Sequence, residues 1–190
     1  MNKILDKIEE WFIYFISFAF MGWIYEVCIM HFELGYGFIN RGFLFGPYIP
    51  LYGFGGLFIL GTTYKIRNKT YKIGGKITEI IINVVLVIII STLLELVASY
   101  IAELVTGARL WDYTDYGPNF EGRIALKSSI QFGLLGLVGL YLVYPIAKIL
   151  NTRIKEKNES VYYFITYFII IIFLLDVLAR ITLGSNYKGP

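Results

Sequence analysis

The chain has 190 residues, of which 57% are hydrophobic and only 16% are charged, and its formal net charge is +3. This composition excludes an ordinary soluble domain, which carries more charge, and the small net charge does not indicate nucleic-acid binding. One cysteine and one histidine exclude an internal disulfide and a multi-histidine metal centre, so we expect no metal and no cofactor. We predict a single integral membrane domain over residues 1–190.

Five apolar segments follow one another along the chain. Each is close to the ~20 residues that an α-helix needs to cross a bilayer. They predict an all-α, polytopic membrane helix bundle with about five transmembrane helices, at residues 11–31, 43–64, 77–105, 128–148 and 161–183.

Basic residues cluster in the predicted loops between these segments. Two lie near the N-terminus, five in residues 65–76 and four in residues 148–157, which is eleven of the seventeen in the chain. With five spans all eleven fall on one side of the membrane, and loops rich in Lys and Arg stay in the cytoplasm. We therefore predict a multi-pass protein of the cytoplasmic membrane with its N-terminus inside and its C-terminus outside.

The second segment opens with the stretch NRGFLFGPYIPLYGFGG at residues 40–56. Pro47 and Pro50 each remove a backbone donor, and the glycines weaken a helix further. Freed carbonyls at membrane depth must face protein or water, so the stretch predicts a second helix that is broken or re-entrant at its outer end. On this interpretation residues 46–53 are not a regular helix and line a pocket open to the outside. A kinked helix start, with proline in the first turn, is the alternative.

Ionisable residues gather at the outer ends of the predicted spans, while the inner halves carry almost none. Charged groups within a membrane usually face a protein interior or a cavity. On the third segment Ser91, Glu95, Ser99 and Glu103 recur at every fourth position and therefore share one helical face. The outer set as a whole is Glu26, Arg41, Glu95, Glu103, Arg123, Lys127, Asp176 and Arg180.

Two ion pairs are predicted within this outer set. Glu95 has no basic neighbour on its own helix, so we expect an arginine from another segment as its partner. Arg41 is the first candidate, and Arg123 and Arg180 are the others. Asp176 and Arg180 lie four residues apart, a spacing that is typical of a local ion pair on one helix.

The loop between the third and fourth segments reads GARLWDYTDYGPNFEGRIALK. Its aromatic and acidic residues, among them Trp111, Asp112 and Tyr113, make it more than a spacer. They favour a lid that rests on the membrane surface. An interfacial turn anchored by Trp and Tyr is the alternative.

These stretches together resemble a family of small bacterial membrane proteins known as "Putative ABC-transporter type IV", or CmpB-like. The matching pieces are GWIYEV at 22–27, the whole of 40–56, LLELV at 93–97, LWDYTDYGPNFEGRI at 110–124 and the Ser/Gly-rich opening of the fourth segment. The resemblance covers most of the chain and implies an all-helical protein of the bacterial inner membrane. By resemblance, the signature positions are Glu26, Arg41, Gly42, Gly46, Pro47, Pro50, Tyr52, Gly53, Glu95, Trp111, Asp112, Tyr113 and Gly122.

Three functions are compatible with these observations, and we favour the first. It is a transport-associated membrane protein, a permease-like or solute-capture subunit, with a charged pocket at the outer membrane surface formed by the broken second helix and the third helix. The chain has no G-x-x-x-x-G-K-[ST] motif, so an ATPase would be a separate subunit. The lipid bilayer is the other expected partner, and a homo-oligomer is left open.

The second function is a membrane-embedded enzyme that acts on a lipid or lipid-linked substrate at the outer leaflet. Glu26, Glu95 or Asp112 would be its acid/base group, and Arg41 or Arg123 its anion binder. The third is a structural or assembly subunit with a polar packing core. Whether the chain catalyses a reaction is left open. The predicted binding residues are Glu26, Arg41, Pro47, Tyr48, Tyr52, Glu95, Trp111, Asp112, Tyr113 and Arg123.

Overall fold

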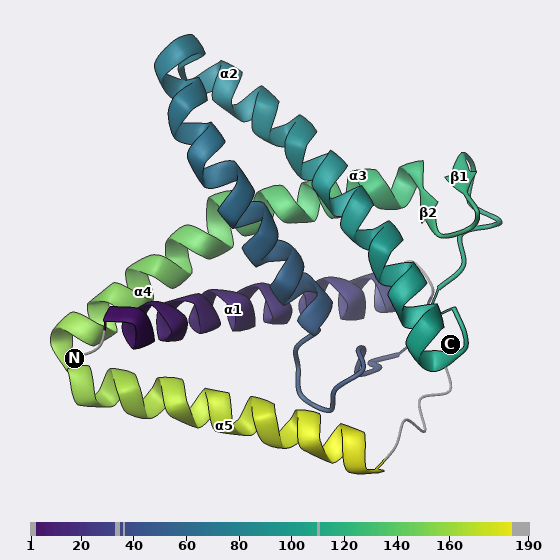
Figure 1. Ribbon diagram of the computed structural model, residues 1–190. Helices are drawn as coiled ribbons and strands as arrows, with labels where there is room; N and C mark the ends of the chain where they lie inside the picture. Colours follow the sequence, from purple (N-terminus) through teal and green to yellow (C-terminus); the bar gives the residue numbers. More distant parts are fainter. Residues whose placement is uncertain (1–2, 33–34, 36, 110, 184–190) are drawn as a thin grey trace. The chain divides into compact units, whose positions relative to one another are not determined.

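The computed structural model describes residues 3–32, 35, 37–109 and 111–183, and most of them are helical (Figure 1). The elements in chain order are α1 (Lys3–Phe32), α2 (Pro50–Thr106), the strands β1 (Asn119–Phe120) and β2 (Ile124–Ala125), α3 (Leu126–Val138), a short π-helix η1 (Gly139–Val143), α4 (Tyr144–Lys157) and α5 (Glu159–Leu183). The two strands pair only with each other, as a small antiparallel hairpin. The predicted all-α class is therefore confirmed.

Four helices in the described part of the chain are long and apolar enough to cross a membrane. They are Ile4–Ile29, Gly75–Leu104, Leu126–Lys157 and Glu159–Leu183. They correspond to the first, third, fourth and fifth predicted spans. For the second predicted span, at 43–64, the structure shows a helix that begins at Pro50 and belongs to α2. A fifth crossing there stays a prediction.

Both basic segments that were predicted as loops are largely helical. α4 continues through residues 148–157 and ends at Lys157, and α2 runs on from Pro50 until its kink at Gly75. Lys, Arg and Glu are strong helix formers, so a basic composition does not interrupt a helix. Gly75 does interrupt it, because its φ of 74° is a left-handed conformation that other residues adopt at a cost.

Within residues 46–53, which were predicted to be irregular, only 46–49 are so, because α2 begins at Pro50. The prediction of an irregular backbone is therefore wrong for residues 50–53, where the alternative of a proline in the first turn is confirmed. Proline fits this position because the first N–H groups of a helix have no intrahelical acceptor to lose.

The glycines near this helix start allow α1 and α2 to approach closely. A Cβ on Gly53 would lie 2.6 Å from ring atoms of Phe15, and a Cβ on Gly56 would lie 2.4 Å from the ring of Phe18. No side chain larger than hydrogen fits there unless the aromatic rings move. The glycines that suggested a broken helix are thus explained by tight helix packing.

The chain divides into two compact units. The first unit contains residues 1–57 and 142–190, and the second contains residues 58–141. Whether the two units belong to one membrane domain depends on how they are joined. The single membrane domain expected from the sequence therefore stays a prediction.

In the first unit, α1 and α5 run in the same direction. Near their starts, the Tyr163 hydroxyl donates to Asp6 at 2.9 Å. Further along, the rings of Phe15 and Phe173 pack edge to face with their centroids 5.5 Å apart. Both helices therefore begin at the same end of this unit.

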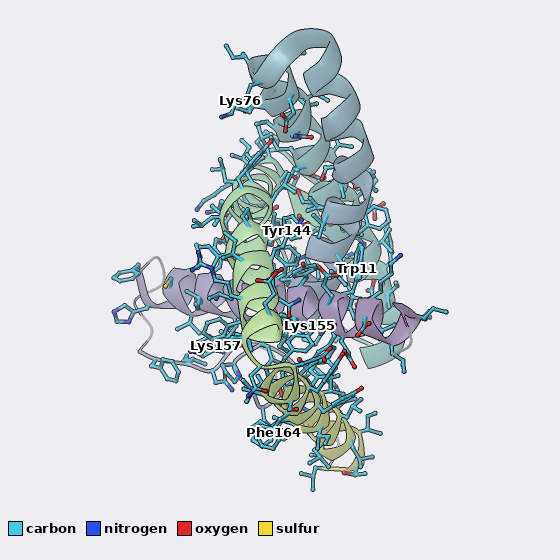
Figure 2. All side chains as sticks on the ribbon, turned by 90° about the vertical axis from the view of Figure 1, so that its left-hand side faces the viewer. Trp11, Lys76, Tyr144, Lys155, Lys157 and Phe164 are labelled. Atoms are coloured by element: carbon cyan, nitrogen blue, oxygen red, sulfur yellow. The ribbon has the colours of Figure 1, made fainter. Side chains whose placement is uncertain are left out.

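α4 runs against α1 in the same unit. Its first residue, Tyr144, packs on Tyr14 with ring centroids 5.1 Å apart, and near its end Lys155 pairs with Asp6 at 2.9 Å. Figure 2 shows Tyr144 and Lys155 along α4, with Lys155 toward the end of the helix that leads into α5. The three helices α1, α4 and α5 thus form an up-down-up bundle.

In the second unit, α3 packs on both halves of α2. A Cβ on Gly136 would lie 2.5 Å from Val87 and 3.3 Å from Ile59, which are on opposite sides of the kink in α2. Asn83 has no exposed surface, and its side-chain amide donates to the Tyr141 hydroxyl at 2.8 Å. α3 and the second half of α2 therefore run antiparallel through an apolar core that contains a polar contact.

Candidate functional site

The first candidate site lies in the first unit, where Asp176 of α5 holds the irregular segment before α2. Its Oδ1 accepts the N–H of Phe45 at 3.0 Å. Its Oδ2 accepts the N–H of Gly46 at 2.7 Å and the hydroxyl of Tyr48 at 2.6 Å. The carboxylate thus supplies the acceptors that a regular helix would have given these N–H groups.

Arg180 holds the same segment from one turn further along α5. Its Nε donates to the carbonyl oxygen of Phe43, and its guanidinium carbon lies 4.4 Å from the centre of the Phe45 ring. Asp176 and Arg180 were predicted to form a local ion pair. No salt bridge joins them among the residues that the structure describes. Each instead contacts residues 43–48, about 130 residues earlier in the chain, which the four-residue spacing could not reveal.

Two side chains of α1 complete the site from the other side. The Trp23 indole donates to the Oδ1 of Asn40 at 2.6 Å, and the amide of Asn40 donates to the Phe45 carbonyl at 2.7 Å. The Tyr52 hydroxyl donates to Glu26 at 2.5 Å. Glu26 and Tyr52, two of the predicted binding residues, are therefore in direct contact.

Two further predicted residues lie in the irregular segment. Pro47 is exposed. Arg41 is half-exposed and, within the part of the chain that the structure describes, forms neither an ion pair nor a hydrogen bond. We call the group of Glu26, Asn40, Arg41, Pro47, Tyr48, Tyr52, Asp176 and Arg180 the Asp176 site.

The second candidate site lies in the second unit and is centred on Arg123, which is only 6% exposed. Its Nη1 donates to the Ser99 hydroxyl at 3.1 Å, its Nη2 pairs with Glu103, and its Nε lies 3.5 Å from Glu121. Its guanidinium carbon is 3.9 Å from the centre of the Tyr100 ring. The hydrogen bond to Glu103 has the largest effect on the pKa of Arg123 and raises it above its usual value. We call this group the Arg123 site.

Glu95 lies buried on the same face of α2. Its Oε2 is 3.3 Å from the Ser128 hydroxyl, which also accepts the N–H of Ala125 at 3.1 Å. The predicted polar face of the third span is confirmed for Glu95, Ser99 and Glu103, all of which contact the start of α3 or the hairpin before it. The predicted pair between Glu95 and Arg41 joins residues of different units and stays a prediction.

The loop before α3 is folded by its own polar side chains. Trp111 donates its indole N–H to the carbonyl of Arg123 at 3.0 Å, and the Tyr113 N–H donates to the Gly122 carbonyl at 2.7 Å. Asp112 accepts both the N–H and the hydroxyl of Thr114, at 2.9 and 2.5 Å. Both hydrogen bonds lower the pKa of the Asp112 carboxyl, and the bond from the Thr114 hydroxyl has the larger effect. Three predicted binding residues thus have clear structural contacts, and their binding role stays a prediction.

Sequence reasoning missed a third polar group, at the end of the first unit where α1 and α5 begin. Glu9 is buried and accepts the Tyr167 hydroxyl at 2.5 Å, while Asn151 of α4 and Thr166 of α5 are also buried. The prediction that the inner span halves carry almost no ionisable residues did not include this group, because Glu9 and Asn151 lie outside the predicted spans and Thr166 is not ionisable. Asn151 was placed in a loop that is helical, and Glu9 precedes the first apolar run. The tyrosines at the start of α5 were the sequence feature that could have indicated this polar group.

Comparison with known proteins gives one positive result. The model of the family described as "Putative ABC-transporter type IV" matches residues 13–181. No curated protein matches the chain, and no solved structure does. The match includes every predicted binding residue and both sites described above. With four helices that can span a bilayer and a family match over most of its length, this chain is a membrane protein that belongs to the "Putative ABC-transporter type IV" family.

Proposed function

We propose that this protein is a transport-associated membrane subunit that captures a solute with an anionic group at the outer membrane surface. The observation that carries the proposal is Arg41. This half-exposed guanidinium has no described partner, although the neighbouring backbone is firmly held by Asp176 and Arg180. The family description supports transport. Without a P-loop motif in the sequence, an ATPase would come from a separate chain.

The Asp176 site leaves few other groups to bind an anion. The N–H groups of Phe45 and Gly46 are occupied by Asp176, and the Tyr48 and Tyr52 hydroxyls donate to carboxylates. A guanidinium offers a planar fork of donors that matches a carboxylate or phosphate. A fixed backbone next to Arg41 also lowers the entropy lost when the side chain orders on a ligand.

Thermal unfolding of the purified protein in lipid nanodiscs tests this proposal. Inorganic phosphate, sulfate and acetate are each titrated at constant ionic strength. We expect at least one anion to raise Tm, because a ligand that binds only the folded state stabilises it. The increase should be lost in Arg41→Gln and kept in Arg153→Gln, a control at an exposed arginine of α4. Equal responses in both variants, or no response in the wild type, would contradict the proposal.

Five crossings with the N-terminus inside are supported by the directions of the helices. Since α4 runs against α1, the chain between these helices crosses the membrane an even number of times. Gly75–Leu104 provides one crossing. The helix that begins at Pro50 would provide the other, and this restores the five spans and the basic inner side expected from the sequence.

Cysteine labelling on intact cells tests this topology. In a Cys28→Ser background, Lys76→Cys and Asp115→Cys place one exposed thiol at the start of the helix Gly75–Leu104 and one after its end. We expect a membrane-impermeant maleimide to label position 115 on intact cells and position 76 only after permeabilisation. Labelling of both from outside would exclude five spans.

An enzyme that acts on a lipid is the weaker candidate. Asp112 is engaged by Thr114, and the buried Glu95 lies against Ser128. A general acid or base must be able to reach its substrate. These contacts favour a structural role, rather than a catalytic one, for Asp112, Glu95 and the neighbouring Arg123 site.

A further inference from the structure

Glu9 is a buried carboxylate with one oxygen that lacks a hydrogen bond. It lies on α1 and is 4% exposed. Its Oε1 accepts the Tyr167 hydroxyl at 2.5 Å, and its Oε2 has no hydrogen-bond partner among the residues that the structure describes. No described lysine, arginine or histidine pairs with it. A buried carboxylate with a single donor is costly unless a positive charge neutralises it.

Oxygen-bearing side chains surround this carboxylate on α4 and α5. Glu9 lies close enough to Tyr162 and Tyr167 to act on both hydroxyls electrostatically. Asn151 and Thr166 lie within hydrogen-bonding range of the Tyr162 hydroxyl. Thr166 is 1% exposed, and its Oγ1 makes no hydrogen bond of standard geometry. Two buried oxygens with spare acceptor capacity therefore occur in one small region, which we call the Glu9 chamber.

Lys155, which approaches this region, is already paired with a carboxylate. Lys155 donates to Asp6 at 2.9 Å, and its ammonium lies 5.2 Å from the centre of the Tyr162 ring and 5.4 Å from that of Tyr163. Figure 2 shows it on α4, close to the turn into α5. The ionisable groups that face the chamber are Asp6, Lys7 and Glu10 on α1, Lys155 and Glu156 on α4, and Tyr162, Tyr163 and Tyr167 on α5.

A water-accessible route leads toward the chamber. A pocket of about 430 Å³ lies at the same end of the unit, and its wall includes Asp6, Glu10 and Glu156. Asn151 and Tyr162 also line it, and these two side chains belong to the Glu9 chamber. Lys7 and Lys155 line it as well, so its three carboxylates exceed its two ammonium groups by one, and this balance favours a small cation.

We propose that the Glu9 chamber binds one monovalent cation, a sodium ion, at the carboxylate of Glu9. One carboxylate balances one positive charge, and carboxylate, hydroxyl and amide oxygens are the ligands that hard cations prefer. A divalent metal is not expected, since no cluster of three or more acidic, histidine or cysteine side chains suited to a metal occurs in the described residues. The site lies apart from Arg41 in the structure of the unit and does not depend on the proposed solute.

Sodium binding is measured on the wild-type protein in nanodiscs. Tm is measured in sodium chloride and in choline chloride at equal ionic strength. We expect Tm to rise with the concentration of sodium and not with that of choline, by the linkage between binding and stability.

Variants assign the sodium response to Glu9. Glu9→Gln keeps an acceptor for Tyr167 and should abolish the response. Asp115→Asn, at an exposed carboxylate of the second unit, should keep it. Thr166→Val leaves the carboxylate intact and should weaken sodium binding several-fold.

Two results would overturn the proposal. One is a wild type whose Tm does not respond to sodium, which would mean that a bound water satisfies Glu9. The other is a signal that persists in Glu9→Gln. Because the wild-type measurements decide the first result, the proposal stays testable even if Glu9→Gln does not fold.

Discussion

The Arg123 site and the Glu9 chamber each contain a charged side chain that is buried to a similar extent. The two charges differ in the number of partners that the protein gives them. Arg123 is 6% exposed and Glu9 is 4% exposed. Arg123 contacts two carboxylates, a hydroxyl and an aromatic ring, whereas Glu9 has one hydroxyl donor and, among the described residues, no cationic partner. A buried charge whose partners are all supplied by the protein mainly holds the fold together. A buried charge without such partners has room for a ligand.

The largest effect is expected from Arg123→Met. Methionine fills much of the same volume but removes the buried guanidinium that pairs with Glu103 and Glu121 and donates to Ser99. Solvent compensates the two partly exposed carboxylates only in part. We expect Tm to fall by about 10 °C. Arg109→Met, at an exposed arginine that lies 3.8 Å from Glu103, should change Tm little. Similar losses in both variants would show that Arg123 is not the centre of the cluster.

A smaller loss is expected from Asp176→Ala, which removes the acceptor for two backbone N–H groups and one hydroxyl. We expect a cost of about 2–3 kcal/mol, reduced because the site is partly open to solvent. Hydrogen exchange should become faster at the amides of Phe45 and Gly46, while exchange in α4 should not change. Unaltered protection of these two amides would mean that Arg180 and Asn40 hold the segment alone.

A substitution at Glu9 should stabilise the protein, in contrast to the two destabilising substitutions above. In sodium-free buffer at alkaline pH, Glu9→Gln removes an unbalanced charge and keeps the Tyr167 hydrogen bond. We expect it to stabilise the protein by roughly 1–2 kcal/mol in denaturant unfolding. Glu103→Gln, which loses its pair with Arg123, should destabilise it under the same conditions. A less stable Glu9→Gln would remove the contrast between the two regions.

The smallest effect is expected at Asp112, next to the Arg123 site. Its folded-state pKa is lowered, so the carboxylate adds stability above its unfolded pKa of about 3.9 and loses it as pH falls through the lower folded value. Asp112→Asn should therefore have a slightly lower Tm than the wild type at pH 7. The difference should vanish in strong acid. A difference that is independent of pH would assign the effect to packing instead of charge.

Sequence patterns predicted the parts of this molecule that depend on one helix at a time. The four-residue spacing of Glu95, Ser99 and Glu103 placed them on one face because helix geometry fixes that face, whatever packs against it. The four-residue spacing of Asp176 and Arg180 was equally informative about their helix. It could not show that both side chains hold residues 43–48, since that contact depends on tertiary packing.

Prolines and glycines were harder to interpret because one residue serves several purposes. Pro50 starts α2 instead of breaking it, and Gly53 and Gly56 make room for Phe15 and Phe18. Only Gly75 interrupts a helix, in a segment whose basic residues had suggested a loop. Glu9 was missed for a related reason: a carboxylate at the edge of an apolar run is usually solvated, and its burial depends on α5.

The hold of Asp176 on Phe45 and Gly46 has a consequence for how the protein is made. The two partners are 131 and 130 residues apart, and the chain is synthesised from its N-terminus. The segment before α2 must therefore wait, with these N–H groups exposed to other acceptors, until the last helix has been inserted. A ribosome-bound chain that stops before α5 should already contain α1 and α2 but lack a settled connection between them. The final helix thus completes a part of the molecule that is among the first to leave the ribosome.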